Sequence, residues 1–188
     1  RGDILDTRQL KKLMKDADVV VHLAAIVTTP FANTDPHFYE QVNHWGTAEV
    51  VYCAEESDIS KFIYLSSTSV YGASDKVFDE TTTPSPSTFY GISKLRGEEH
   101  VNRLAEKKNA INIRGGNVYG YSKSMRFDAV INRFMFDANF TNRIQINGKT
   151  SAGVVADKVE TMPTFPPVSA NKIKVMPIAM ARTPESAV

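Results

Sequence analysis

Polar and apolar positions along the first part of the chain are grouped in blocks that predict a helix followed by a strand. Asp6 or Thr7 can cap a short helix that has one apolar face. That face consists of Leu10, Leu13 and Met14. Residues 18–25 then form a nearly continuous apolar run, which is typical of a strand buried on both faces of a parallel sheet.

A longer helix is predicted next, with Asp35 as its cap, Pro36 at its first position and an end near Ser57. Its apolar positions include Phe38, Val42, Trp45, Val50 and Val51. Residues 61–66 read as the next strand.

The pattern repeats once more and then weakens. Residues 81–87 are rich in Pro, Ser and Thr and predict a loop. A helix over residues 88–107, a strand over 110–114 and an amphipathic helix over 125–139 follow. This alternation predicts an α/β fold with a parallel sheet covered on both sides. Ligands bind beyond the carboxyl ends of such strands, where residues 66–69 fall.

Regular periodicity ends near Gly148. Five of the nine prolines lie in the last 26 residues, and no helix-length periodic stretch occurs there. We therefore expect an irregular, Pro-rich tail.

Composition excludes several classes of function. The chain has 188 residues, of which 42% are apolar and 23% charged, and its net charge is +1. A nearly neutral chain without a basic stripe gives no reason to expect binding to nucleic acid or to an anionic membrane. The longest apolar stretch, residues 19–27, is far shorter than the ~20 residues of a membrane helix.

The single cysteine, Cys53, cannot form an intramolecular disulfide, so a reducing compartment such as the cytoplasm is expected. The histidines lack companions at metal-ligand spacing, and we predict no metal site.

Tyr90 and Lys94 carry the clearest indication of chemistry. In a helix, their i,i+4 spacing puts the phenol and the ammonium on one face. A nearby positive charge favours the phenolate and makes Tyr a better base. A hydroxyl from the Ser-rich segment around Ser67 could hold a substrate oxygen during proton transfer. Taken alone, the pair also fits an ordinary helix surface.

Several motifs in order make the chain resemble the extended short-chain dehydrogenases/reductases, the family of NAD-dependent sugar epimerases and dehydratases. The resemblance runs from about Gly2 to Gly148. The motifs that carry it are Gly2-Asp3-Ile4, His22-Leu23-Ala24-Ala25, Asn43-His-Trp-Gly46-Thr47, Ser66-Ser-Thr-Ser-Val-Tyr-Gly72, Tyr90-Gly-Ile-Ser-Lys94 and Arg114-Gly-Gly-Asn-Val-Tyr-Gly120.

The resemblance implies a Rossmann-like, doubly wound parallel sheet, incomplete in this chain, over residues 1–120. Residues 121–188 would form part of a small C-terminal substrate-binding region. It implies roles for particular residues as well. The catalytic residues would be Ser67, Tyr90, Lys94 and Asn43. The cofactor-binding residues would be Asp3, Ile4, Leu23, Ala24, Ala25, Tyr90 and Lys94. The substrate-binding residues would be Ser67, Thr68, Asn117, Arg126 and Asn132.

Some of these residues also have plain structural readings. Asp3 could cap a turn, His22 could be a satisfied buried histidine, Asn43 could face solvent and Asn117 could form a turn.

The cofactor implied is NAD, with NADP left open, and the substrate a small molecule, most simply a nucleotide-sugar. A homodimer is implied for the parent protein.

The chain departs from the family pattern in three places. It contains no Gly-x-x-Gly-x-x-Gly turn for the pyrophosphate, so we expect an internal fragment that is inactive as written. Thr68 and Ser69 stand where dehydratases carry an Asp-Glu pair, which disfavours 4,6-dehydration. No arginine occurs between Arg143 and Arg182 to clamp a diphosphate, although Val155-Ala-Asp157 resembles the sequence that follows that arginine.

An epimerase-type oxidoreductase is therefore the predicted function. A one-way ketone reductase or alcohol dehydrogenase of the same family and a non-catalytic member are the alternatives.

Overall fold

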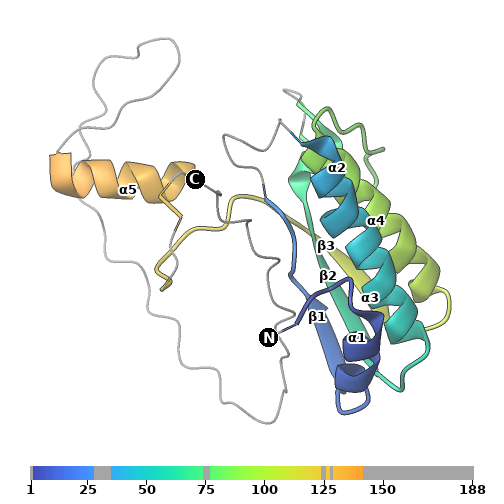
Figure 1. Ribbon diagram of the computed structural model, residues 1–188. Helices are drawn as coiled ribbons and strands as arrows, with labels where there is room; N and C mark the ends of the chain where they lie inside the picture. The colour runs from blue at the N-terminus through green and yellow to red at the C-terminus, as the bar shows by residue number, and fades with distance from the viewer. Residues whose placement is uncertain (1, 28–34, 74–76, 124–125, 128, 142–188) are drawn as a thin grey trace. The chain divides into compact units, whose positions relative to one another are not determined.

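The computed structural model describes residues 2–27, 35–73, 77–123, 126–127 and 129–141 (Figure 1). The chain divides into two units at Gly116–Asn117, and each is described by itself. The predicted Pro-rich tail and the segment Val155-Ala-Asp157 lie outside the described residues.

The first unit is built on a three-stranded parallel sheet. Its strands are β1 (Val19–His22), β2 (Lys61–Ser67) and β3 (Ala110–Gly115), in the order β1-β2-β3. His22 pairs with Tyr64, which pairs with Asn112 in turn, so these three positions point to the same face. The predicted α/β fold with a parallel sheet is confirmed. β1 is shorter than predicted, because regular pairing stops at His22.

Helix α1 (Thr7–Met14) is capped by Asp6, whose side chain accepts a hydrogen bond from the N–H of Gln9. The predicted long helix is also present, capped by Asp35 with Pro36 in its first turn. It consists of α2 (Pro36–Tyr39), a π-helical segment η2 (Glu40–Trp45) and α3 (Gly46–Glu55). The π-helical segment was not predicted from the sequence. Such segments often occur at functional sites, and this one contains Asn43.

After β2 the chain turns through a short 3₁₀ helix, η3 (Thr68–Tyr71), and an irregular loop before α4 (Phe89–Ala105). The hydroxyl of Ser67 caps η3, and that of Thr88 caps α4. Because short polar side chains stabilise helix starts in this way, the hydroxyl-rich segments set the ends of both elements.

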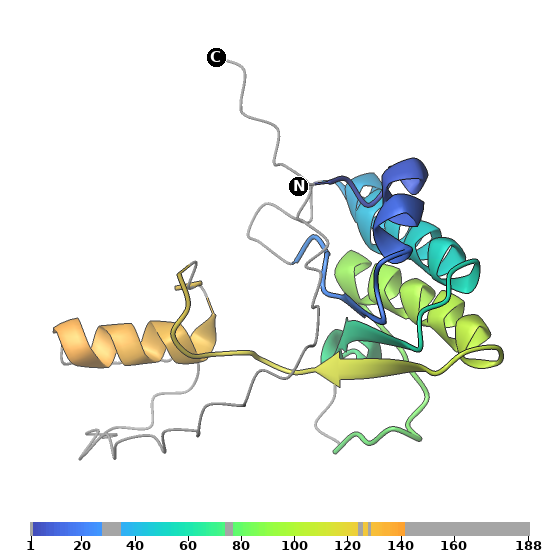
Figure 2. The same cartoon turned by 90° about the horizontal axis from the view of Figure 1, so that it is seen from below.

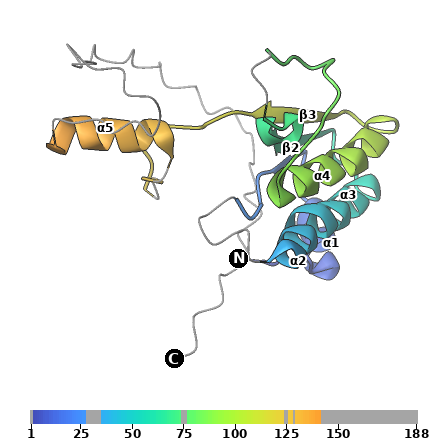
Figure 3. The ribbon, with the colours of Figure 1, turned by 90° about the horizontal axis from the view of Figure 1, so that it is seen from above.

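The helices of the first unit lie on one face of the sheet, as Figures 1 and 3 show from two directions. α4 packs on β2 and β3, α3 packs on β1, and α1 packs on α3. Figure 2 shows the same two layers from below. The core between them contains Leu10, Met14, Val20, Val50, Val51, Phe62, Tyr64, Val101 and Leu104.

The other face of the sheet is not covered by the described helices of the first unit. Ile111 and Ile113 of β3 are 40% and 45% exposed. The prediction of cover on both sides is therefore not met within the described residues. Two predicted apolar positions also point outward, since Trp45 is 58% exposed and Leu13 is 39% exposed. Periodicity alone assigns a large apolar residue to the core, although aromatic side chains are often found on surfaces.

The described part of the second unit ends with α5 (Val130–Thr141), which begins five residues later than predicted. Asn132 is buried on this helix. Its side-chain oxygen accepts a hydrogen bond from the N–H of Gly120 at 3.1 Å, and its amide group donates to the carbonyl of Arg126 at 3.0 Å. Asn132 therefore ties the preceding loop to the helix.

Candidate active site

Tyr90 and Lys94 both lie in the first turns of α4, as their spacing predicted. Lys94 is only 2% exposed, whereas Tyr90 is partly exposed. The ring of Tyr39, from α2, meets the ring of Tyr90 edge-on with 6.2 Å between the centroids. The helix surface that carries the pair is thus not an ordinary solvent-facing one, and the phenol lies at the border between the core and solvent.

The Lys94 ammonium lies above the ring of Tyr64, 4.1 Å from its centroid. Burial lowers the pKa of Lys94 to about 7, while the field of Glu98, one turn along α4, acts in the opposite direction. A group with this pKa is partly charged near neutrality. Lys94 can therefore change its charge in response to its surroundings, which sequence reasoning did not predict.

His22, at the end of β1, also contacts the ring of Tyr64. The two rings are stacked, with 5.3 Å between their centroids, and Nε2 of His22 is 2.9 Å from the hydroxyl of Thr47. Burial lowers the pKa of His22 to about 3, and the field of Lys94 adds to this effect. His22 is therefore neutral at physiological pH and belongs to the buried scaffold, although its Nδ1 has no hydrogen-bond partner among the described residues.

Ser67 ends β2 at its carboxyl end and is 9% exposed. Its hydroxyl accepts a hydrogen bond from the N–H of Ser69 at 3.2 Å and donates one to the hydroxyl of Ser69 at 3.1 Å. The following residue, Thr68, is exposed. A serine hydroxyl can rotate its proton between acceptors, so Ser67 can exchange its bond to Ser69 for one to a bound oxygen atom.

Gly91, the neighbour of Tyr90, brings this serine turn against α4. A Cβ atom at position 91 would lie 2.5 Å from the carbonyl oxygen of Ser69 and 3.0 Å from Cβ of Pro86. Only glycine permits such an approach of two backbones. The turn that starts at Ser67 is thus held against the first turn of the helix that carries Tyr90.

Asn43 connects the loop after β1 with α4. Its side-chain oxygen accepts a hydrogen bond from the N–H of Ile26 at 2.7 Å, and its amide group donates to the carbonyl of Ile26 at 2.9 Å and to the hydroxyl of Ser93 at 3.1 Å. Ser93 in turn donates to the carbonyl of Tyr90 at 2.9 Å. Asn43 is fully buried and not solvent-facing. This geometry favours a positioning role, because its polar atoms are used within the chain.

A second, partly buried cluster, whose contacts were not predicted from the sequence, holds η3, β3 and α4 together. Arg114 of β3 donates to both carboxylate oxygens of Glu98, at 2.7 Å from Nη2 to Oε2 and 3.0 Å from Nε to Oε1. It also donates to the hydroxyl of Tyr71 at 3.0 Å. Glu98 raises the pKa of Arg114 further above its usual range. No local spacing in the sequence pairs Arg114 with Glu98 or Tyr71, because these contacts join three separate elements.

The residues predicted to contact the cofactor differ in their exposure to solvent. Leu23 is 52% exposed directly beyond β1, and the small residues Ala24 and Ala25 follow it. Asp3 is exposed and accepts a hydrogen bond from the N–H of Leu5 at 2.9 Å. This bond agrees with the alternative that Asp3 caps a turn. The Ile4 side chain is buried in the core, where it restricts the space at Gly46. Cofactor contact by these residues stays a prediction.

The residues predicted to bind substrate in the second unit differ in exposure. Asn117 and Arg126 are exposed, and Asn132 uses both ends of its amide within its own unit. The bonds of Asn132 favour a loop-ordering role. Its contact with substrate, like that of Asn117 and Arg126, stays a prediction.

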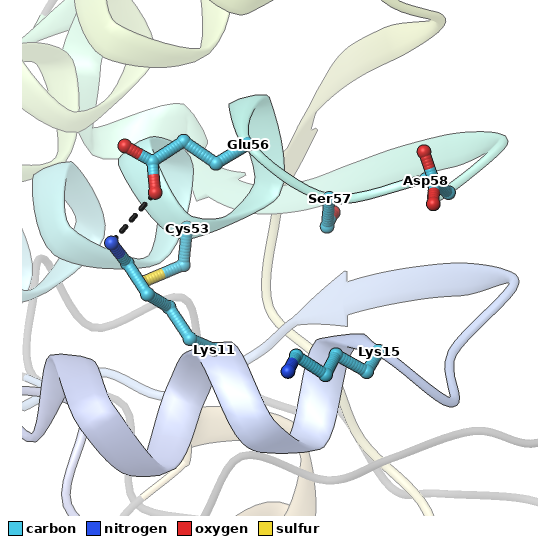
Figure 4. A pocket seen from close by; sticks show the side chains of 6 residues that line it. All are labelled: Lys11, Lys15, Cys53, Glu56, Ser57 and Asp58. Atoms are coloured by element: carbon cyan, nitrogen blue, oxygen red, sulfur yellow. Dashed lines mark ion pairs between the residues drawn. The ribbon is translucent and has the colours of Figure 1, made fainter.

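A hollow of about 250 Å³ lies away from these residues (Figure 4). It lies between α1 and the segment that joins α3 to β2, near the amino end of the sheet. Its rim includes an exposed ion pair between Lys11 and Glu56 at 2.6 Å. Parallel sheets bind ligands at their carboxyl ends, so we do not assign the active site to this hollow.

Within the part of the chain that the structure describes, no group of three or more His, Cys, Asp or Glu side chains could hold a metal ion. None of the described helices is long and apolar enough to cross a membrane.

Tyr90, Lys94 and the turn that starts at Ser67 thus lie in the first turns of α4 and at the carboxyl end of β2, where parallel sheets bind ligands. Comparison with known proteins identifies the family. The chain matches the NAD dependent epimerase/dehydratase family over residues 1–149 and belongs to it. The members of this family are enzymes.

Three similar proteins illustrate the range of the family. Human dTDP-D-glucose 4,6-dehydratase is 36% identical over 125 residues, which cover 64% of this chain and 36% of the relative. The UDP-glucuronic acid 4-epimerase of Bacillus cereus, solved with UDP-glucuronic acid and NAD, is 32% identical with a TM-score of 0.65, covering 74% of this chain and 44% of that one.

The third, RMD from Pseudomonas aeruginosa complexed with NADPH, is 28% identical with a TM-score of 0.62 and covers 70% of this chain and 46% of that one. The chain thus spans from about a third to a half of the length of these relatives.

Proposed function

We propose that the protein is an NAD-dependent nucleotide-sugar epimerase in which Tyr90, Lys94 and Ser67 control proton transfer at a sugar hydroxyl. The observation that supports this most is the position of the Lys94 ammonium, buried on the same helix face as the partly exposed Tyr90 phenol. Similarity to enzymes that act on dTDP- and UDP-sugars supports the substrate class.

The residues present fit part of a nicotinamide dinucleotide. Leu23 offers an exposed apolar side chain beyond β1, the small Ala24 and Ala25 leave room for close approach, and Lys94 offers a cation. When bound, NAD accepts the hydride from the sugar carbon and later returns it. The 188 residues contain no Gly-x-x-Gly-x-x-Gly turn, so the proposal for this chain concerns the nicotinamide end of the cofactor.

In the proposed mechanism, Tyr90 removes the proton of the sugar hydroxyl as the carbon loses hydride. Lys94, in its charged form, stabilises the phenolate that Tyr90 needs as a base. The Ser67 hydroxyl turns from Ser69 to the reacting sugar oxygen and holds it. Asn43 and Ser93 keep the backbone around Tyr90 in place, since their hydrogen bonds end on the Tyr90 carbonyl. Tyr90 would return the proton to the sugar oxygen if hydride came back to the opposite face of the ketone, which would complete an epimerisation.

Replacement of Tyr90 tests the proposal. In the intact protein, Tyr90→Phe keeps the ring contact with Tyr39 and removes the proton-transferring oxygen. We expect the turnover rate to fall by ~10²–10⁴-fold while the Kd for NAD changes little. The exposed Tyr52→Phe is the matched control and should leave both quantities unchanged. Turnover at the wild-type rate in Tyr90→Phe would remove Tyr90 from the mechanism.

Two alternative activities use the same residues. A one-way reductase would consume NADH or NADPH with each turnover, so a lasting change in nicotinamide absorbance separates it from an epimerase. The similarity to a protein complexed with NADPH keeps this alternative and the choice of cofactor open to test. A 4,6-dehydratase is disfavoured, because Thr68 and Ser69 cannot shuttle protons as a carboxylate pair can.

A homodimer is part of the proposal. It is supported by an aromatic surface on η2, α3 and α4 that consists of His44, Trp45, Tyr52, His100 and Arg103. Trp45 and Tyr52 are 58% and 48% exposed there. Exposed aromatic clusters often mark interfaces between proteins. A cytoplasmic location remains a prediction from the single cysteine, and cell fractionation would test it.

A further inference from the structure

Tyr64 has no role in the proposed mechanism. Its ring nevertheless lies between the Lys94 ammonium, which the mechanism uses, and the core. Tyr64 occupies the middle of β2 and is fully buried, with its ring facing α4. Lys94 covers one side of that ring at 4.1 Å from Nζ to the centroid, and His22 is stacked against the ring at 5.3 Å between centroids. The ammonium therefore lies against one of two stacked rings.

The close approach of α4 to Tyr64 depends on Gly97, which follows Lys94 by three residues. A Cβ atom at position 97 would lie 2.4 Å from the Tyr64 hydroxyl oxygen and 3.3 Å from the carbonyl oxygen of Asn43. A larger residue would push the helix or the ring away. The contact between the ammonium and the ring is thus built into the packing of α4 on β2.

The electrostatics of this contact are unusual for a buried lysine. Burial lowers the pKa of Lys94, and Glu98 opposes this but is itself engaged by Arg114. His22, stacked against the ring, is neutral. The partly exposed Tyr90 is a further titratable group on α4. The negative face of an aromatic ring stabilises a cation that has lost its water, so Tyr64 supplies attraction where burial has removed hydration.

We propose that Tyr64 is a positioning residue of the active site, a cation–π platform that holds the Lys94 side chain in place and keeps it protonated beneath Tyr90. The function of the platform rests on the proposed function, but its existence is testable without catalysis. Loss of the ring should lower the fraction of Lys94 that is charged at neutral pH. The Tyr90 phenolate would then be stabilised less by the Lys94 ammonium.

The test follows the titration of Lys94 by NMR in the intact protein without cofactor or substrate. Lysine labelled with ¹³C at Cε reports the charge of each ammonium, and the Lys94 signal is identified by its loss in Lys94→Arg. We expect Tyr64→Leu to move the titration midpoint of Lys94 down by about one pH unit. Tyr64→Phe keeps the ring without the hydroxyl and should titrate close to wild type.

Phe62→Leu provides a matched control. Phe62 lies two residues away on the same face of β2, is equally buried, and approaches His22 with 6.4 Å between ring centroids. It should lose a comparable amount of stability, yet leave the Lys94 midpoint in place. If Phe62→Leu and Tyr64→Leu moved the Lys94 midpoint by the same amount, Tyr64 would contribute only to core packing, and the proposal would be overturned.

A wild-type measurement covers the case in which Tyr64→Leu does not fold. Protons on Cε of a lysine above a ring face are displaced upfield by the ring current. Their absence from an upfield position in the wild-type protein would overturn the proposal without any variant. A shifted Lys94 midpoint in Tyr64→Leu, together with unchanged turnover in Tyr90→Phe, would sink the proposed function and keep the platform.

Discussion

At the residue scale, Lys94 combines a catalytic assignment with a cost in stability. The folded protein holds its ammonium in a site where the pKa falls to about 7 from the ordinary 10.5. Between these two values the unfolded chain binds the proton more tightly than the folded one does. The contribution of Lys94 to the free energy of unfolding therefore rises with pH in this window and is lowest below pH 7.

We predict that Lys94→Met removes this dependence. The free energy of unfolding of the wild type should rise relative to that of the variant by up to about 1.4 kcal/mol per pH unit between pH 7 and 9.5. Below pH 7 the variant should be the more stable protein, although it loses activity. Urea denaturation of both proteins across this range measures the difference.

The exposed Lys12→Met is the control, because it changes charge on the surface without touching the buried site. A constant difference between wild type and Lys94→Met over the whole range would mean that Lys94 is not desolvated in the folded protein.

At the scale of elements, the active-site helix is fastened at several points to elements distant in sequence. Gly91 lies against the serine turn, Asn43 bonds to Ser93, and Glu98 binds Arg114 of β3. Each contact joins α4 to a different segment. The positions of Tyr90 and Lys94 relative to the sheet therefore depend on tertiary contacts more than on helix propensity.

We predict that breaking the Glu98–Arg114 pair from one side is costly. Arg114→Met leaves the carboxylate of Glu98, 2% exposed, without its partner and should lower the free energy of unfolding by about 3 kcal/mol. The double variant Glu98→Met/Arg114→Met should recover part of this loss, because no uncompensated buried charge remains. Urea denaturation at pH 7 measures all three proteins.

Arg133→Met serves as the comparison for that experiment. The Arg133–Asp137 pair on α5 is 2.8 Å long but its arginine is 62% exposed, so its loss should have little effect. Equal losses in Arg114→Met and Arg133→Met would show that burial of Glu98 does not amplify the cost.

At the scale of the whole molecule, the aromatic surface is the feature that single-chain packing leaves unexplained. The rings of His44 and Trp45 are stacked at 4.6 Å between centroids, and those of His44 and His100 at 5.2 Å. These contacts arrange the aromatic groups in a continuous patch across η2, α3 and α4. A second copy with the same patch could bury both.

We predict that Trp45→Glu converts the intact protein from dimer to monomer. A carboxylate in place of the exposed indole would lose its hydration at the interface and would remove the ring that is stacked on His44. Light scattering coupled to size-exclusion chromatography measures the change. Val77→Glu, at a position that is 98% exposed, is the control and should keep the wild-type mass. A wild-type monomer would refute the homodimer directly.

The sequence by itself determined the order and type of the main elements. Caps such as Asp6, Asp35 and Thr88 and the spacing of apolar residues depend on neighbours within one or two turns, so local physics suffices to place helix starts. The same is true of the i,i+4 relation between Tyr90 and Lys94. Motifs in order also sufficed for the family, which the comparison confirmed.

Only the tertiary structure decided the environment of those residues. The platform of Tyr64 against Lys94, the stacking of His22 on Tyr64 and the Glu98–Arg114 pair arise between residues that are 16 to 42 positions apart. The outward position of Trp45 and the π-helical turn at Asn43 have the same origin. Desolvation and ring contacts depend on what packs above a residue, and periodicity carries no information about that neighbour.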